Sequence, residues 1–296
     1  MFKNLSPSLI GVSGRQSELI ELALTFGFHS LEVNIDDFVK KAQKQTVEHA
    51  ARFLTSGQLK LGSFQLPIEW RGTEEAYRTE LEQLEAIAQV AAAAGGTVCY
   101  TPIEPASDVY PYHDNFELHR KRLAEIAENL GKHELRLGIA LQPLPAHRAG
   151  KEFQFIFEAD ALVTLMKSIP ASNVGLYIDT WNWHFGGGTV GQLSALDGSQ
   201  VVGLTVADAP TGIDTESASE SQRLLPSDEG VIDIVGMISQ LKDLGVRAPV
   251  SLAAAPESFS GLNRERIVQK CSQVLDDLWK VAGLVPDANP TPALSS

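Results

Sequence analysis

The sequence is poor in cysteine and has no long apolar run. Its 296 residues include two cysteines, Cys99 in a strand-like run and Cys271 on a helical pattern. These exclude a disulfide framework and a thiolate metal site, so we expect both to pack in a core. No window approaches the ~18 uninterrupted apolar residues of a membrane span, and the start "MFKNLSPSLIGVSG" has no apolar segment behind a basic one. Neither a span nor a signal peptide is predicted, and the expected location is the cytoplasm.

Positive charge is also scarce. Lysine and arginine number 24 against 37 aspartate and glutamate residues, which gives a formal net charge of −13. This charge repels phosphate backbones and anionic lipids, and no local basic patch offsets it, so nucleic-acid and membrane partners are not expected. A composition of 44% hydrophobic and 21% charged residues is typical of a soluble globular protein. Assembly into a homo-oligomer stays open.

A recurring unit is present instead: a helical run, a glycine and a short β-branched strand. It is seen in "ALTFGFHSLEVN", "AAAAGGTVCYT" and "DLGVRAPVSLA", with glycine where a helix needs a left-handed residue to stop. The strands are almost continuously apolar, which is typical of parallel strands covered on both faces. The predicted strands are 8–13, 29–34, 59–66, 96–101, 135–142, 173–179, 200–207 and 248–253.

Amphipathic helices lie between these strands, for example at 73–93 and 114–130. Eight strand–helix units in a chain of this length predict an α/β fold with a single closed (β/α)₈ TIM barrel over residues 1–285. An open doubly wound sheet is the alternative, but "GVSGRQSEL" lacks the third glycine of a dinucleotide-binding turn. The last residues, 286–296, are rich in Pro, Ser and Ala and are expected to form a disordered tail.

Chemistry in such a barrel takes place where the strands end, and there the chain resembles a known family. The segments are "SFQLPIEWRG", "LGIALQPLP", "NVGLYIDTWNWH", "VVGLTVADAP", "RLLPSDEGVIDI" and "APVSLAAAPES". Together they resemble the xylose-isomerase-like sugar phosphate isomerase/epimerase family, in the right order and over nearly the whole chain. The resemblance implies a TIM barrel that isomerises or epimerises a sugar or sugar phosphate with the help of a divalent metal ion.

The metal site implied by the resemblance is degenerate here. The family holds Mn²⁺, Mg²⁺ or Zn²⁺ with a glutamate, an aspartate, a histidine and a glutamate at the ends of strands five to eight. The resemblance places Gln142, Asp179, Thr205 and Ala253 at these four positions. Only the aspartate is kept, so one negative charge remains of three, and neither an amide nor a hydroxyl restores that charge. We therefore expect no metal and no other cofactor.

Three titratable residues at strand ends are catalytic candidates. Glu32, which ends the second strand, is suited to act as a base in proton abstraction, and a salt-bridged rim residue is the alternative. Asp179 is either a pocket residue or a relic that hydrogen-bonds the neighbouring loop. His184 is suited to general acid–base catalysis, although a packed loop histidine fits the same position.

Five further residues are candidates for binding substrate. Trp70 and Trp181 offer ring faces on which a sugar could stack, and ordinary core packing is the alternative. The resemblance places Arg223 near a substrate's distal hydroxyls or phosphate, whereas a loop-anchoring ion pair would use the same planar fork. Asn182 stands where the family has a histidine that contacts substrate, and Gln142 keeps the shape of a glutamate.

Two functions follow from these positions. The first is a metal-free barrel that binds a small polyhydroxylated ligand, such as a sugar or sugar phosphate, as a carbohydrate-binding or non-catalytic homologue. The second is an active sugar isomerase or epimerase that uses the remaining pocket acids or a rearranged metal site. Fold alone does not decide between them.

Overall fold

The computed structural model describes residues 1–227 and 229–284, and its centre is a parallel sheet. In this part of the chain the order of the strands is β3-β2-β1-β11-β10-β9-β7-β5-β4. Every neighbouring pair is parallel. The strands are β1 (Phe2–Leu5), β2 (Ser30–Leu31), β3 (Lys60–Leu61), β4 (Phe64–Gln65), β5 (Val98–Pro102), β7 (Arg136–Ala140), β9 (Val174–Asp179), β10 (Val201–Val206) and β11 (Pro249–Leu252).

The sheet closes through the short segment that contains β3 and β4. Leu61 of β3 pairs with Leu31 of β2, whereas Phe64 of β4 pairs with Cys99 of β5. The single strand predicted at 59–66 therefore has two halves that bond to different neighbours, and it joins the two ends of the sheet order. The molecule is the predicted TIM barrel, an α/β fold.

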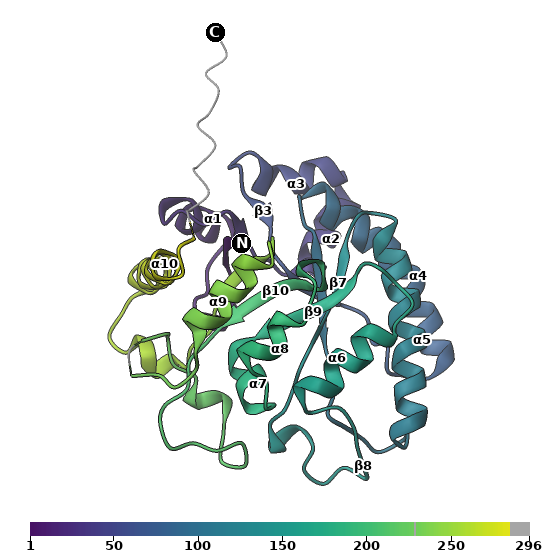
Figure 1. Cartoon of the computed structure of the whole chain (residues 1–296). Helices are drawn as coiled ribbons and strands as arrows, with labels where there is room; N and C mark the ends of the chain where they lie inside the picture. Colours follow the sequence, from purple (N-terminus) through teal and green to yellow (C-terminus); the bar gives the residue numbers. More distant parts are fainter. Residues whose placement is uncertain (228, 285–296) are drawn as a thin grey trace.

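Helices cover the outside of the barrel (Figure 1). Their bounds are α1 (Gln16–Thr25), α2 (Ile35–Lys44), α3 (Val47–Thr55), α4 (Glu74–Ala93), α5 (Tyr112–Gly131), α6 (Ala159–Ser168), α7 (Thr180–Phe185), α8 (Val190–Ser194), α9 (Ile234–Asp243) and α10 (Arg264–Val281). The predicted helices 73–93 and 114–130 correspond to α4 and α5. The start of α4 is set by Thr73, whose hydroxyl accepts the Ala76 N–H at 3.3 Å. None of the helices in these described residues is both long enough and apolar enough to cross a membrane.

The first predicted strand, 8–13, is wrong. Residues Pro7–Ile10 form a 3₁₀ helix that ends at Gly11, whose φ of 65° is left-handed. The true first strand, β1, contains two polar residues that disguise it. Lys3 pairs with Asp276 of α10 at 2.8 Å, and the Asn4 side chain donates to the Ser251 hydroxyl of β11 at 2.8 Å.

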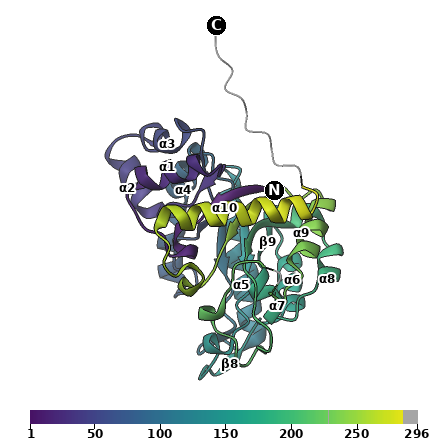
Figure 2. The ribbon, with the colours of Figure 1, turned by 90° about the vertical axis from the view of Figure 1, so that its left-hand side faces the viewer.

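The two ends of the barrel differ in the chain segments that lie there. In Figure 1 β8 (Phe153–Gln154) and the loop between β10 and α9 lie at the lower end, beyond the carboxyl ends of the strands, whereas the N-terminus lies above the middle of the molecule. β8 pairs antiparallel with β6 (Ala106–Ser107). Figure 2 shows α10 lying along the side of the barrel, in contact with α1, α9 and β1. The lower end is therefore the mouth, and the predicted tail, 286–296, lies outside the described residues.

Candidate functional site at the mouth of the barrel

The register of the last three strands brings their carboxyl ends together. Asp179, the last residue of β9, is paired with Thr205 of β10. Val206, the next residue of β10, is paired with Leu252 of β11, which directly precedes Ala253. These three strand ends therefore form one continuous arc, called here the β9–β11 arc.

Gln142 extends this arc on its other side. Ile139 of β7 is paired with Leu176 of β9, so the same register carries Gln142 level with Asp179. The four positions named by the sequence comparison are thus neighbours at one edge of the barrel. Their side chains are a half-buried amide, a carboxylate, a buried hydroxyl and a buried methyl group.

This donor set does not fit a divalent metal ion. Hard cations need several oxygen ligands with negative charge, and only Asp179 provides one. The Thr205 hydroxyl donates to the Tyr177 hydroxyl at 3.4 Å, and the Ala253 side chain has no donor atom. Among residues 1–227 and 229–284, no group of three or more His, Cys, Asp and Glu side chains is arranged to hold a metal.

The remaining carboxylate, that of Asp179, is already paired. Nη1 of Arg223 donates to both of its oxygens at 2.9 Å, and Oδ1 also accepts the Asn182 N–H at 3.1 Å. The two charged side chains are largely buried, with 10% of Arg223 and 14% of Asp179 exposed. Asp179 thus anchors the Arg223 side chain and caps the first turn of α7.

Arg223 is held on every side. Its Nε donates to Glu220, its Nη2 lies 3.4 Å from the Asn182 side-chain oxygen, and its guanidinium lies 5.5 Å from the centre of the Trp181 ring. Burial alone would lower the pKa of Arg223, but Asp179 and Glu220 outweigh burial and raise the pKa above its usual value. Arg223 therefore stays charged, and it fastens the loop before α9 to the end of β9.

Glu32 lies across the mouth, directly after β2. Its Oε2 is buried and has no hydrogen-bond partner among the described residues, and the same holds for the hydroxyl of Ser6, which follows β1. Burial raises the pKa of Glu32 to about 7, and the nearby Ser6 hydroxyl, which acts to lower the pKa, opposes this only in part. A carboxyl with such a pKa changes its charge close to neutral pH.

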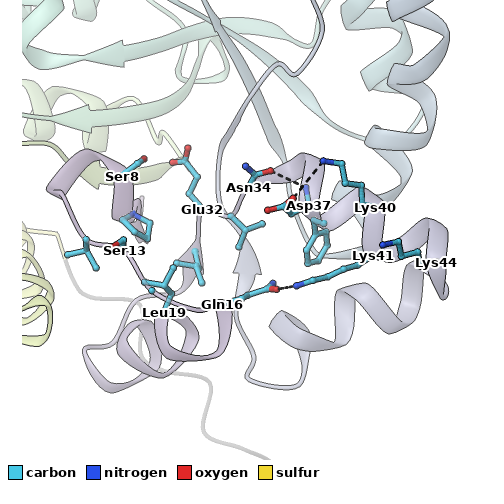
Figure 3. Close-up of a pocket in the computed structure, with 16 residues that line it drawn as sticks. Ser8, Ser13, Gln16, Leu19, Glu32, Asn34, Asp37, Lys40, Lys41 and Lys44 are labelled. Carbon is cyan, nitrogen blue, oxygen red and sulfur yellow. Dashed lines mark hydrogen bonds and ion pairs between the residues drawn. The ribbon is translucent and has the colours of Figure 1, made fainter.

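A cavity of about 730 Å³ lies beside Glu32, between the segments that follow β1 and β2 (Figure 3). Ser8, Ser13, Gln16 and Asn34 contribute polar side chains to its lining. Lys40, Lys41 and Lys44 of α2 also line it, and Figure 3 shows them on the opposite side from the Glu32 carboxylate. This region is called here the β1–β2 side of the mouth, and it can hold a ligand the size of a sugar.

The predicted tryptophans are in the core. Trp70 and Trp181 have no exposed surface, and the Trp70 Nε1 donates to the Thr101 hydroxyl at 3.0 Å. His184 lines a separate cavity of about 240 Å³ that Val231 and Met237 also line. Burial lowers the pKa of His184, and Asp208 opposes the change. The structure does not bring these three predicted residues to the cavity beside Glu32.

Sequence reasoning missed Tyr177, which lies inside the barrel between the two sides of the mouth. Its ring stacks on that of Tyr100 at 4.2 Å, and its hydroxyl lies 3.0 Å from the Ser63 hydroxyl. Burial, followed by the charge of Glu32, raises the pKa of Tyr177 to about 12. The sequence signal for this packing is Gly203, a glycine inside an apolar strand. A Cβ atom at that position would come within 2.3 Å of the Tyr177 ring.

A closed parallel barrel with its polar groups at the carboxyl ends of the strands defines the (β/α)₈ class of proteins. The family model described as xylose isomerase-like TIM barrel matches residues 20–278. The chain therefore belongs to this family of sugar isomerase/epimerase-like barrels. No curated protein sequence matches the chain.

Several solved structures have the same fold. The chain is similar to a xylose isomerase domain protein from Alicyclobacillus acidocaldarius, with 24% identity and a TM-score of 0.85 over 96% of this chain and 99% of that one. It is similar to the IOLI protein with a binding zinc atom, with 15% identity and a TM-score of 0.76 over 95% and 99%. A D-psicose 3-epimerase with D-tagatose from Clostridium cellulolyticum H10 gives 12% identity and a TM-score of 0.75 over 95% and 99%.

Proposed function

We propose that this chain is a metal-independent member of its family that binds a small polyhydroxylated molecule, a sugar or sugar phosphate, on the β1–β2 side of the mouth. The observation that carries the proposal is the buried, unpartnered Oε2 of Glu32 at the edge of the large cavity. A buried polar atom without a partner costs about 1–3 kcal/mol. A ligand hydroxyl that donates to Glu32 would remove this cost on binding.

The metal-independent part of the proposal rests on the β9–β11 arc. Three of the four positions at which the family would hold its ion have no charged side chain, and Asp179 is bonded to Arg223. A structural relative has a binding zinc atom, but the donors that zinc prefers, thiolate, imidazole and carboxylate, are reduced here to one occupied carboxylate.

The lining of the cavity favours a ligand with an anionic group. Lys40, Lys41 and Lys44 stand on α2, and an ammonium group binds phosphate as a point charge. Asp37 also lines the cavity and lies 3.9 Å from Lys40, so the three lysines outnumber the two acidic lining residues, Glu32 and Asp37, by one. A sugar phosphate would direct its hydroxyls to Glu32 and its phosphate to α2.

Catalysis by Glu32 is the second candidate. A general base is most effective when its pKa lies near the working pH, and the pKa of Glu32 is about 7. In an active isomerase or epimerase Glu32 would remove a proton beside a carbonyl of the bound sugar, and a protonated Glu32 would return it. The negative charge that develops on the carbonyl oxygen would need a cationic or hydrogen-bonding partner, and the lysines of α2 line the same cavity.

Ligand-induced stabilisation tests the proposal. Sugars, sugar phosphates and polyols are screened by thermal shift, and a ligand at a hundredfold excess over its Kd is expected to stabilise the fold by about 2.7 kcal/mol. Glu32→Gln should weaken the response to every active compound, Lys44→Met should weaken the response to phosphorylated compounds alone, and the exposed control Glu82→Gln should change neither. If no compound shifts the melting temperature, or if Glu32→Gln responds like the parent, the proposal is wrong.

A further inference from the structure

The position of Arg223 relative to the strand ends is unusual for a loop residue. Its guanidinium bonds both oxygens of Asp179 at the end of β9. Its main-chain carbonyl accepts the N–H of Ala255 at 2.9 Å, two residues beyond Ala253 at the end of β11. One residue thus connects the first and last strands of the β9–β11 arc.

We infer that the Arg223 guanidinium is a built-in cation that stands in the place of the divalent ion implied by the family. A bound ion would neutralise Asp179 and hold the strand ends together, and Arg223 does both by covalently tethered contacts. The guanidinium supplies a positive charge to the single carboxylate that the arc retains, although it also pairs with the half-exposed Glu220 of the loop. The inference deepens the proposed function, since it supplies the reason why the site needs no metal.

A guanidinium in this place offers fewer open positions to a substrate than a metal ion would. Four of its five N–H donors are directed to Asp179, Glu220 and Asn182, so at most one N–H of Nη2 has an open direction toward a substrate carbonyl. An ion with an exchangeable ligand would have such a position. Arg223 is therefore a positioning residue that holds the loop after β10 against the mouth, and the ligand is left to the β1–β2 side.

The charge and position of Arg223 also predict which substitutions are needed to rebuild a metal site. The triple variant Gln142→Glu, Thr205→His and Ala253→Glu restores the ligand types implied by the family around Asp179, but the guanidinium would pair with the new carboxylates. Adding Arg223→Met removes that competitor. Only the quadruple variant is expected to bind Mn²⁺.

Calorimetric titration of the chelator-treated proteins with Mn²⁺ is the test. The expected result is binding by the quadruple variant and at least tenfold weaker binding, or none, by the triple variant. Equal binding by both variants would show that Arg223 does not occupy the ion's place, and absence of binding by a folded quadruple variant would overturn the inference as well. Sugar binding by the parent chain is measured separately, so either result leaves the proposed function standing or falling on its own.

A single substitution covers the case in which the multiple variants do not fold. Arg223→Ala is expected to lower the melting temperature by about 6 °C or more, since it leaves a buried carboxylate unpaired. Low millimolar guanidinium chloride, compared with sodium chloride, should recover part of this loss in Arg223→Ala. It should recover nothing in the control Arg120→Ala, which removes an exposed partner of Glu117. Loss without rescue by guanidinium would contradict a cation-specific role.

Discussion

The two sides of the barrel mouth differ in how completely the chain satisfies its own polar groups. On the β9–β11 arc, the Asp179 carboxylate and the Arg223 guanidinium are paired with each other and with neighbouring groups. On the β1–β2 side, the Glu32 Oε2 and the Ser6 hydroxyl are buried without partners, and a large cavity lies alongside.

This difference supports different roles for the two sides of the mouth. A satisfied ion pair stabilises the fold it belongs to, but it offers a ligand little, because binding would have to break existing bonds. An unsatisfied carboxyl destabilises the fold, and a ligand that pairs with it gains binding free energy. We therefore propose that the side that resembles the family's metal site has a structural role in this chain, and that the side without that resemblance binds the ligand.

The largest expected effect comes from breaking the ion pair on the structural side. Arg223→Met should lower the free energy of unfolding by about 3 kcal/mol or more, because it leaves the buried Asp179 carboxylate without an ionic partner. Asp179→Asn should cost less, because Arg223 keeps its ion pair with Glu220. The double variant should lose clearly less than the sum of the two, by at least ~1 kcal/mol. Urea unfolding measures all three. The exposed pair Lys151 and Asp108, changed in the same way, should cost under ~1 kcal/mol, and additive losses at the buried pair would contradict the coupling.

The next effect is the pH dependence of stability that Glu32 causes on the β1–β2 side. Its pKa is raised from 4.5 to about 7 in the folded chain, so the folded state holds a proton that the unfolded state releases first. Stability should therefore fall as the pH rises from about 4.5 to 7, by up to roughly 3 kcal/mol.

Glu32→Gln should remove this fall. The stability of Glu32→Gln minus that of the parent should therefore be larger at pH 8 than at pH 5. Unfolding in urea at several pH values measures the difference, and Glu82→Gln, at an exposed position, is the control. Parallel stability curves for the parent and Glu32→Gln would contradict the burial of an uncompensated carboxyl.

The smallest effect is expected where the two sides meet, at Tyr177. Tyr177→Phe removes a hydroxyl that lies 3.0 Å from the Ser63 hydroxyl, and it should cost about 1 kcal/mol. The double variant with Ser63→Ala should cost less than Tyr177→Phe and Ser63→Ala added together, because the second change removes a group that the first has left unpartnered. Tyr112→Phe, at a position that is 47% exposed, is the control. A neutral Tyr177→Phe would show that the hydroxyl pair does not connect the two sides.

The sequence predicted the barrel because its local signals agree with one another. The glycines that end helices and the apolar runs after them place most of the strands, and the register then brings Gln142, Asp179, Thr205 and Ala253 to one arc. The first strand was missed because Lys3 and Asn4 hide its apolar pattern. Their partners, Asp276 and Ser251, lie at the far end of the chain.

The site was less predictable because it depends on contacts between distant segments. The pattern around Arg223 left a substrate contact and a loop-anchoring ion pair equally open, and the bond to Asp179, 44 residues away, is set by the path of a long loop. Trp70 and Trp181 follow strands, which suggested a stacking wall, but in the structure both rings are fully buried. The cavity beside Glu32 arises from the packing of α1, α2 and the segments before them, and no motif encodes it.

The ladder between β1 and β11 has a consequence for the order of folding. Phe2 is paired with Pro249, so the chain must bring together segments from opposite ends before the ring of strands is complete. Such non-local contacts form late and slowly, because loop-closure entropy is lost before they contribute. Until then β1 has an unpaired edge and Asn4 has no Ser251 to bond. A ribosome-bound chain that stops before residue 249 should therefore expose a strand edge prone to association.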